Sequence, residues 1–96
     1  MKPKQTMLQD LHNLKAKLKK FKVKNLWAFG SFVRGEQTKN SDIDILVDFK
    51  DGADLFDQIG LGLFLEEQLG RKVDVVSKRA LRGELRNIIL KEAIAV

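Results

Sequence analysis

The stretch FGSFVRGE (residues 29–36), followed by QTKN (37–40) and SDIDILVDF (41–49), decides the fold expected of this chain. The apolar segment NLWAF (25–29) leads into it and predicts a short buried strand that ends at a glycine. Residues 43–49 are rich in β-branched side chains and predict a second strand. Because side chains alternate between the two faces of a strand, Asp42 and Asp44 point to the same side.

Working outward from these strands, helical and extended patterns alternate. Met7, Leu11, Leu14 and Leu18 form the apolar stripe of an amphipathic helix over residues 6–20, which should pack on a sheet. The other expected elements are a short helix, a second long helix, a third strand and a closing helical region, over residues 31–36, 54–69, 72–76 and 81–96. This order predicts an α/β (α+β) domain, a small mixed β-sheet flanked by helices. A crossover helix between the second and third strands favours a parallel or mixed arrangement.

Length and composition restrict the class of protein. With 96 residues, the chain is expected to form a single domain over residues 1–96. It has no cysteine, no apolar run long enough to cross a membrane and no signal-like start, so we expect a cytoplasmic location without membrane contact. The net charge of +5 favours anionic partners. Much of that excess lies between Lys15 and Lys24, where it is typical of a solvated helix face.

Three aspartates are candidates for metal chemistry. Asp42 and Asp44, two positions apart on a strand, have a spacing that suits a pair of divalent ions, although alternating acids are also common on solvated strands. Asp74 interrupts the apolar third strand. It is either exposed at a sheet edge or paired with Lys72, or it completes a metal site and accepts a proton as general base.

The Gly30-Ser31 turn is a candidate phosphate site. A glycine where a strand passes into a helical turn lets an anion approach backbone N–H groups, and Ser31 adds a hydroxyl donor. A plain strand-to-helix bend explains the same dipeptide. The Walker pattern and Gly-x-Gly-x-x-Gly are both absent here.

Taken together, Gly30-Ser31, the pair Asp42 and Asp44, and Asp74 within VDVV (73–76) resemble the signature of the DNA polymerase beta-like nucleotidyltransferase superfamily. The fuller strings at 29–36 and 41–47 resemble its minimal nucleotidyltransferase branch, which includes antitoxins that accompany HEPN-domain toxin ribonucleases. The resemblance covers a catalytic core of about residues 24–96.

That resemblance implies roles for individual residues. Gly30 and Ser31 would hold the triphosphate of ATP, Asp42 and Asp44 would bind two Mg²⁺ ions, and Asp74 would assist as metal ligand and base. Arg34 falls where a basic residue would steady phosphate, but a salt bridge to Glu36 or another acid explains it equally well.

The resemblance also implies a reaction. AMP would pass from ATP to a hydroxyl of a protein partner, a tyrosine of a HEPN-type toxin, and so neutralise it. The 96 residues contain no tyrosine of their own. Alternatives are steric masking of the toxin with little catalysis, a small-molecule or nucleic-acid acceptor, or nucleic-acid binding through the basic first helix. The acceptor, the base preference, the number of nucleotides transferred and the oligomeric state, homo-oligomers included, stay open.

Other conspicuous residues receive no chemical role. His12 is expected on the polar side of the first helix, and Trp27 in the core or a partner interface. Asp48 and Asp51 are interpreted as turn and capping acids. The apolar residues Phe56, Leu63 and Phe64 are generous for so small a core, and either pack on the sheet or dock a partner.

Overall fold

The computed structural model describes residues 4–38 and 40–96. In this part of the chain the strands form one sheet in the order β3-β2-β1-β4. The strands are β1 (Val23–Phe29), β2 (Ile43–Phe49), β3 (Val73–Ser77) and β4 (Ile94–Ala95). β1 is antiparallel to both β2 and β4, whereas β2 and β3 are parallel. The predicted mixed sheet is confirmed, and β3, reached through a crossover helix, is the strand that runs parallel to its neighbour.

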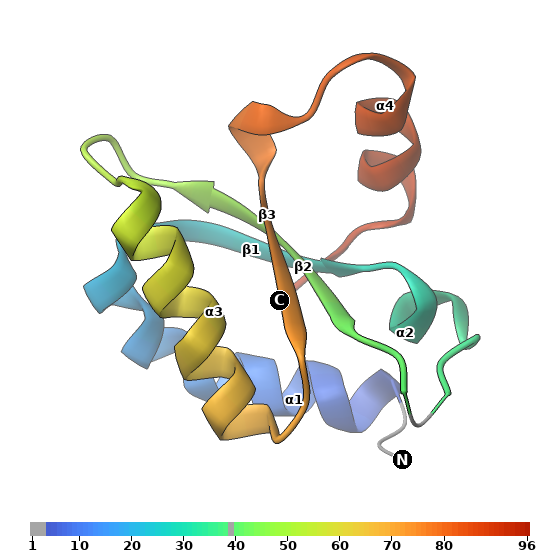
Figure 1. Cartoon of the computed structure of the whole chain (residues 1–96). Coiled ribbons are helices and arrows are strands. Elements are labelled where there is room, and N and C mark those ends of the chain that lie inside the picture. The colour runs from blue at the N-terminus through green and yellow to red at the C-terminus, as the bar shows by residue number, and fades with distance from the viewer. Residues whose placement is uncertain (1–3, 39) are drawn as a thin grey trace.

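Helices cover both faces of the sheet. They are α1 (Lys4–Leu14), α2 (Ser31–Arg34), α3 (Leu55–Leu69) and α4 (Gly83–Glu92), with the 3₁₀ helices η1 (Lys15–Phe21) and η2 (Lys78–Ala80). α1, η1 and α3 lie on one side of the sheet and α4 on the other (Figure 1). Among the described residues, no helix is long and apolar enough to cross a membrane.

Two apolar clusters hold these layers together. The larger one joins α1, η1 and α3 to Ile43, Ile45 and Val47 of β2. The smaller one lies on the opposite face, where Leu46 packs with residues of β1 and α4. The β2 face that carries Asp44 is therefore covered in its middle part, where Leu46 is fully buried between Asp44 and Asp48.

The first helix is shorter than expected. Its apolar stripe does run from Met7 to Leu18, both buried, but α-helical geometry ends at Leu14 and η1 continues to Phe21. The segment KAKLKK (15–20) places lysines four positions apart, and like charges at that spacing destabilise an α-helix. Lys22 then ends the turn in the left-handed region with φ of 60°.

The closing region is not helical throughout, which corrects the expected span of 81–96. α4 ends at Glu92, and residues 94–95 pair with Trp27 and Ala28 at the free edge of β1. The Val96 N–H also donates to the Leu26 carbonyl at 3.0 Å. A strand this short has no periodicity to detect, so only the tertiary pairing reveals it.

Candidate active site

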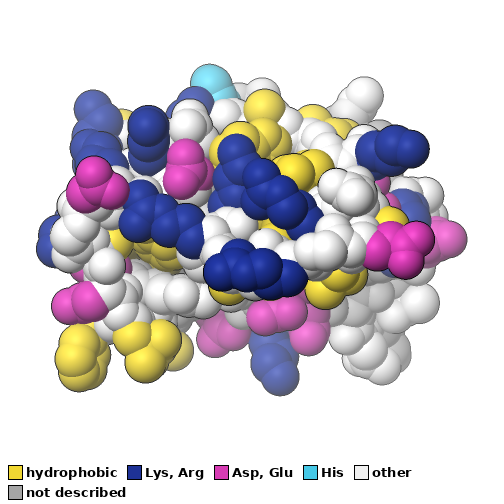
Figure 2. All heavy atoms as spheres, turned by 90° about the horizontal axis from the view of Figure 1, so that it is seen from above, with side chains coloured by type: hydrophobic (Ala, Val, Ile, Leu, Met, Phe, Trp, Pro, Cys, Tyr) yellow, Lys and Arg dark blue, Asp and Glu magenta, His cyan; other side chains and the backbone are white. Residues whose placement is uncertain are grey.

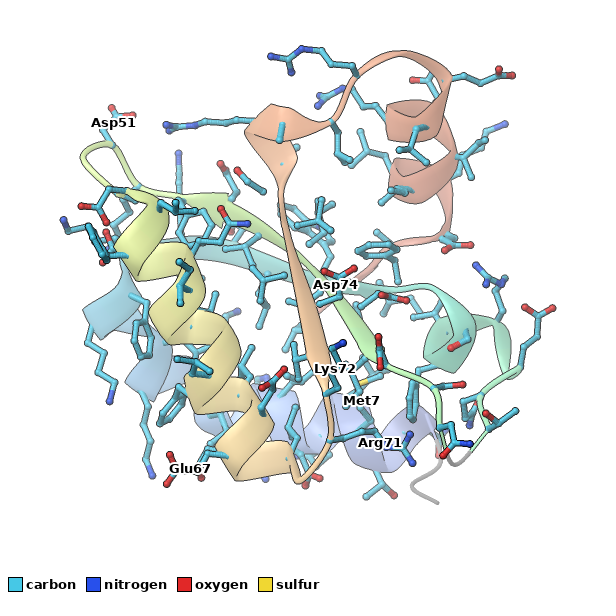
Figure 3. All side chains as sticks on the ribbon, viewed as in Figure 1. Met7, Asp51, Glu67, Arg71, Lys72 and Asp74 are labelled. Carbon is cyan, nitrogen blue, oxygen red and sulfur yellow. The ribbon has the colours of Figure 1, made fainter. Side chains whose placement is uncertain are left out.

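The sheet register brings the predicted residues of three strands into one row. Phe29 of β1 pairs with Asp44 of β2, and Asp44 pairs with Asp74 of β3. Asp42 lies just before the first residue of β2. Asp74 lies on β3, well away from Asp51 in the turn after β2 (Figure 3). Gly30, Asp44 and Asp74 therefore meet at one end of the sheet.

Gly30 makes this close meeting sterically feasible. Its φ of 82° and ψ of −155° belong to a region that favours glycine, and it precedes α2. A Cβ atom added to it would lie 2.1 Å from Asp44 Oδ2 and 3.0 Å from Asp44 Cγ. The Asp44 carboxylate therefore occupies the space that a side chain at position 30 would fill.

Asp44 is the electrostatic centre of the site. Burial, followed by the neighbouring charges of Asp74 and Asp42, raises the pKa of its carboxyl to about 6. Arg34 opposes the rise, whereas Glu92 adds to it. Such a concentration of carboxylates favours a bound cation, because a cation relieves both the desolvation and the mutual repulsion.

Arg34 is anchored by two carboxylates. Its Nε donates to Glu36 Oε1, and its Nη1 donates to the two Glu92 carboxylate oxygens at 3.0 and 3.1 Å. The hydrogen bonds that it donates to Glu36 and then to Glu92 raise the pKa of the guanidinium above its ordinary value. The salt-bridge interpretation of Arg34 is thus observed, and within the described residues its Nη2 has no protein hydrogen bond.

Arg71 fixes the loop that carries Asp42. Its Nη1 donates to the carbonyl oxygens of Ser41 at 2.7 Å and of Thr38 at 3.3 Å. Its guanidinium also lies 5.2 Å from the centre of the Phe32 ring. A polar hollow of about 230 Å³ borders Asp42 and is lined by Asn40, Ser41, Asp42, Gly70, Arg71 and Lys72.

The three carboxylates are suitable ligands for Mg²⁺, but their side chains do not converge on one point. Mg²⁺ prefers oxygen ligands, and Asp42, Asp44 and Asp74 supply them. In residues 4–38 and 40–96, however, no three His, Cys, Asp or Glu side chains converge closely enough to hold an ion. Asp74 is exposed on the edge strand β3, so its side chain is able to turn toward Asp44.

Sequence reasoning missed two residues at this site, Glu92 and Arg71. Neither lies in a motif, and each acts through a contact between segments far apart in the chain. Ser31 begins α2 as expected, and its hydroxyl has no partner among the described residues.

Several residues set aside from the sequence lie away from the site. His12 is exposed on α1, as expected. Trp27 packs against the smaller apolar cluster, with Lys78 Nζ 5.0 Å from its ring centre. Asp51 pairs with Arg79 at the turn after β2.

Part of the α3 surface is apolar and open to solvent. Phe64 packs on Phe21, but Phe56 is 83% exposed and Leu63 is 63% exposed. Leu55 and Ile59 extend this apolar strip along α3. The strip, Leu55, Phe56, Ile59 and Leu63, is therefore not used for packing on the sheet.

Lys and Arg side chains also gather on a face of the molecule to which the first helix does not contribute. Figure 2 shows Lys and Arg side chains across the side of the molecule on which η2 and α4 lie. These two elements and the segment between them contribute Lys78, Arg79, Arg82 and Arg86. The basic excess is thus shared between η1 and this second face.

Two curated relatives cover most of the chain. A protein of Methanocaldococcus jannaschii assigned as a protein adenylyltransferase is 46% identical over 79 residues, which are 82% of this chain and 85% of that protein. The protein adenylyltransferase MntA of Thermococcus cleftensis is 42% identical over 77 residues, 80% of this chain and 78% of its own.

Solved structures agree with these relatives. A structure assigned as a minimal nucleotidyltransferase superposes with a TM-score of 0.87 at 36% identity, covering 99% of this chain and 97% of that one. A toxin–antitoxin crystal structure with AMP-PNP gives 0.71 at 30% identity, with coverages of 86% and 69%. A complex of tri-AMPylated Shewanella oneidensis HEPN toxin with MNT antitoxin gives 0.65 at 25% identity, with coverages of 93% and 69%.

The family model described as nucleotidyltransferase domain matches residues 11–96, which include every candidate site residue. The chain therefore belongs to the nucleotidyltransferase domain family, and it is a nucleotidyltransferase enzyme of the minimal type.

Proposed function

We propose that this chain transfers AMP from ATP to a hydroxyl of a protein partner, with Mg²⁺, and that the partner is a HEPN-type toxin which the modification neutralises. The observation that supports it most is the row formed by Asp44 and Asp74 beside Gly30. Two carboxylates next to a glycine turn that opens a helix are the parts that metal-assisted nucleotidyl transfer needs.

Asp42, Asp44 and Asp74 are the proposed ligands of two Mg²⁺ ions. When bound, the ions offset the charge of the triphosphate and favour ionisation of the acceptor hydroxyl. The pKa of Asp44, which burial and then the charges of Asp74 and Asp42 raise to about 6, supports this proposal, because a bound cation offsets both effects.

The side chains around Gly30 are proposed to hold the triphosphate. Gly30, whose missing Cβ leaves room for the Asp44 carboxylate, gives the turn into α2 its backbone conformation, and Ser31 offers a hydroxyl donor. Arg34, held through Nε and Nη1, presents Nη2 to a phosphate oxygen without having to be ordered on binding.

Asp74 is the proposed general base. It accepts the proton of the acceptor hydroxyl while that oxygen forms a bond to the α-phosphorus. The bond from the α-phosphorus to the oxygen bridging to the β-phosphate breaks, and pyrophosphate leaves with that electron pair. As an exposed residue on an edge strand, Asp74 is accessible to a hydroxyl brought by a macromolecule.

A protein acceptor is supported by two kinds of evidence. The relatives are named protein adenylyltransferases, and one structural neighbour holds a tri-AMPylated HEPN toxin. The α3 strip of Leu55, Phe56, Ile59 and Leu63 is also the kind of exposed apolar surface that marks a protein interface.

The test is transfer of label from α-labelled ATP in the presence of Mg²⁺. The purified chain is incubated with and without the product of the neighbouring reading frame, and label on protein is measured. We expect label on that partner with the wild type and with Asp48→Asn, and none with Asp42→Asn. Asp48 is the matched control because it lies on the same strand face as Asp44, beyond Leu46. Retained labelling by Asp42→Asn would refute the assignment.

A second candidate is neutralisation by steric masking, for which the exposed α3 strip is the favouring observation. In that case the variant with Asp42, Asp44 and Asp74 all changed to Asn still protects cells from the partner, whereas Phe56→Ser does not. Protection that is lost in the triple variant but survives Phe56→Ser supports transfer instead.

A further inference from the structure

Glu92 is a further acidic side chain that contacts the site, beside the three aspartates, and no motif includes it. It is the last residue of α4, and its side chain is 22% exposed. Its Oε1 accepts a hydrogen bond from the Gly30 N–H at 2.8 Å. Both of its oxygens also accept from Arg34 Nη1. One carboxylate therefore joins α4 to the turn after β1 and to the arginine of α2.

Two electrostatic effects oppose a carboxylate at this position. The C-terminal end of a helix carries partial negative charge, which disfavours an acid in the last turn. Glu92 is also close enough to Asp44 to raise the pKa of that carboxyl. The contacts to Gly30 and Arg34 are what offset these costs.

Those contacts constrain the two groups that matter for phosphate. The hydrogen bond from the Gly30 N–H to Glu92 fixes the orientation of this peptide plane. Gly30 itself has a positive φ and no room for a side chain. Glu92 holds Arg34 through Nη1, and Glu36 holds it through Nε, so both of these guanidinium nitrogens are fixed. Charge-assisted bonds of this kind are stronger and more directional than neutral ones.

We propose that Glu92 is a positioning residue of the nucleotide-binding turn, which holds the Gly30 peptide and the Arg34 guanidinium in place from the end of α4. This inference rests on the proposed function of Gly30 and Arg34. It makes α4 part of the site, although no residue of that helix belongs to the nucleotide-binding signature.

The experiment compares Glu92→Ala and Glu92→Gln, each with and without Arg34→Ala, and uses Glu84→Gln as the matched control. Glu84 is exposed in the first turn of the same helix. A non-hydrolysable ATP analogue with Mg²⁺ is titrated calorimetrically, and exchange of the Gly30 amide hydrogen is followed by NMR. KM for ATP and kcat are measured in the labelling reaction.

Glu92→Ala is expected to weaken analogue binding and raise KM by about tenfold or more, as for loss of hydrogen bonds to a charged group. Glu92→Gln keeps an acceptor for the Gly30 N–H and should restore slow exchange and part of the affinity. In the Arg34→Ala background the effect of Glu92→Ala on affinity should be smaller, because the two residues act together.

The inference is overturned if Glu92→Ala binds the analogue as the wild type does, or more tightly, or if exchange at Gly30 is unchanged. A variant that is merely less stable would show no rescue by Gln and no coupling to Arg34. Failure of the wild type itself to bind the analogue would instead refute the proposed function, and the Gly30 exchange would still report whether Glu92 holds the turn.

Discussion

Asp44→Asn should stabilise the metal-free domain while abolishing transfer. The carboxylate of Asp44 is half-buried between Gly30 and Asp74, and burial followed by the charges of Asp74 and Asp42 raises its pKa from 3.8 to about 6. A raised pKa means that the folded state disfavours the ionised form. Asparagine has nearly the same shape and no charge, so it fills the space beside Gly30 without this cost.

The magnitude follows from the pKa shift. A rise from 3.8 to about 6 corresponds to about 3 kcal/mol at 1.36 kcal/mol per unit. Solvent screening of a half-buried group reduces this to roughly 1.5 kcal/mol. Between pH 3.8 and about 6 the folded chain binds more protons at Asp44 than the unfolded chain does, so the free energy of unfolding falls as pH rises through that window.

The assay is urea unfolding of wild type, Asp44→Asn and the control Asp48→Asn, at a pH above 7 and again near pH 4.5. We expect Asp44→Asn to exceed the wild type by roughly 1.5 kcal/mol at the higher pH and by about a third of that at the lower one. Added Mg²⁺ should stabilise the wild type more than Asp44→Asn, because only the folded wild type retains all three ligands. A destabilised Asp44→Asn, or a difference independent of pH, would refute this account of the site.

Three further predictions concern the frame of the site. Gly30→Ala should lose about 1–3 kcal/mol of stability and nearly all transfer activity, since its Cβ would overlap Asp44. Gly35→Ala, also at a positive φ but with no atom within 4 Å of its Cβ, should lose only about 1 kcal/mol and keep transfer; equal activity of the two variants would contradict the steric argument. Leu46→Ala should cost about 2–5 kcal/mol in urea unfolding, because Leu46 is fully buried on the α4 side; a cost below about 1 kcal/mol would argue against a second core. Asp54→Ala removes one half of the capping box of α3 and should lower the free energy of unfolding by about 1 kcal/mol while label transfer is unchanged; reduced transfer would tie α3 to the site.

The strands β1, β2 and β3 and the long helix α3 were predictable because their signals are local. Residues 43–49 are apolar and β-branched, and β2 has those bounds. The helix expected over 54–69 is α3, whose cap at Asp54 and stop at Gly70 are both present in the structure. Turn and capping chemistry depends on neighbours in sequence, so it is visible before any fold is known.

Features that depend on distant pairing were not predictable. The alternation in β2 places Leu46 on the same face as Asp44, and only the position of α4 decides that this part of the face is covered. Asp44 and Asp74 were candidates for one metal site, but whether they lie side by side depends on the register of β2 with β3. Glu92 carried no signal, because an acid in the last turn of a helix opposes the helix dipole and belongs to no motif.

The charges at this site disfavour the ionised form of Asp44 in the free domain. We expect binding of the substrate complex to relieve this electrostatic cost. The pKa of Asp44 is raised by burial, by Asp74 and by Asp42, and it is lowered by Arg34. Arg34 is itself shared with Glu36 and Glu92, so it compensates Asp44 only in part. If divalent cations accompany the triphosphate, they complete the charge balance that Arg34 leaves incomplete. The same arrangement makes the order of binding matter, because a triphosphate without cations would meet the carboxylates unshielded. Binding of ATP should therefore depend far more steeply on Mg²⁺ in the wild type than in Asp44→Asn. This difference measures how much of the ATP affinity requires the bound metal.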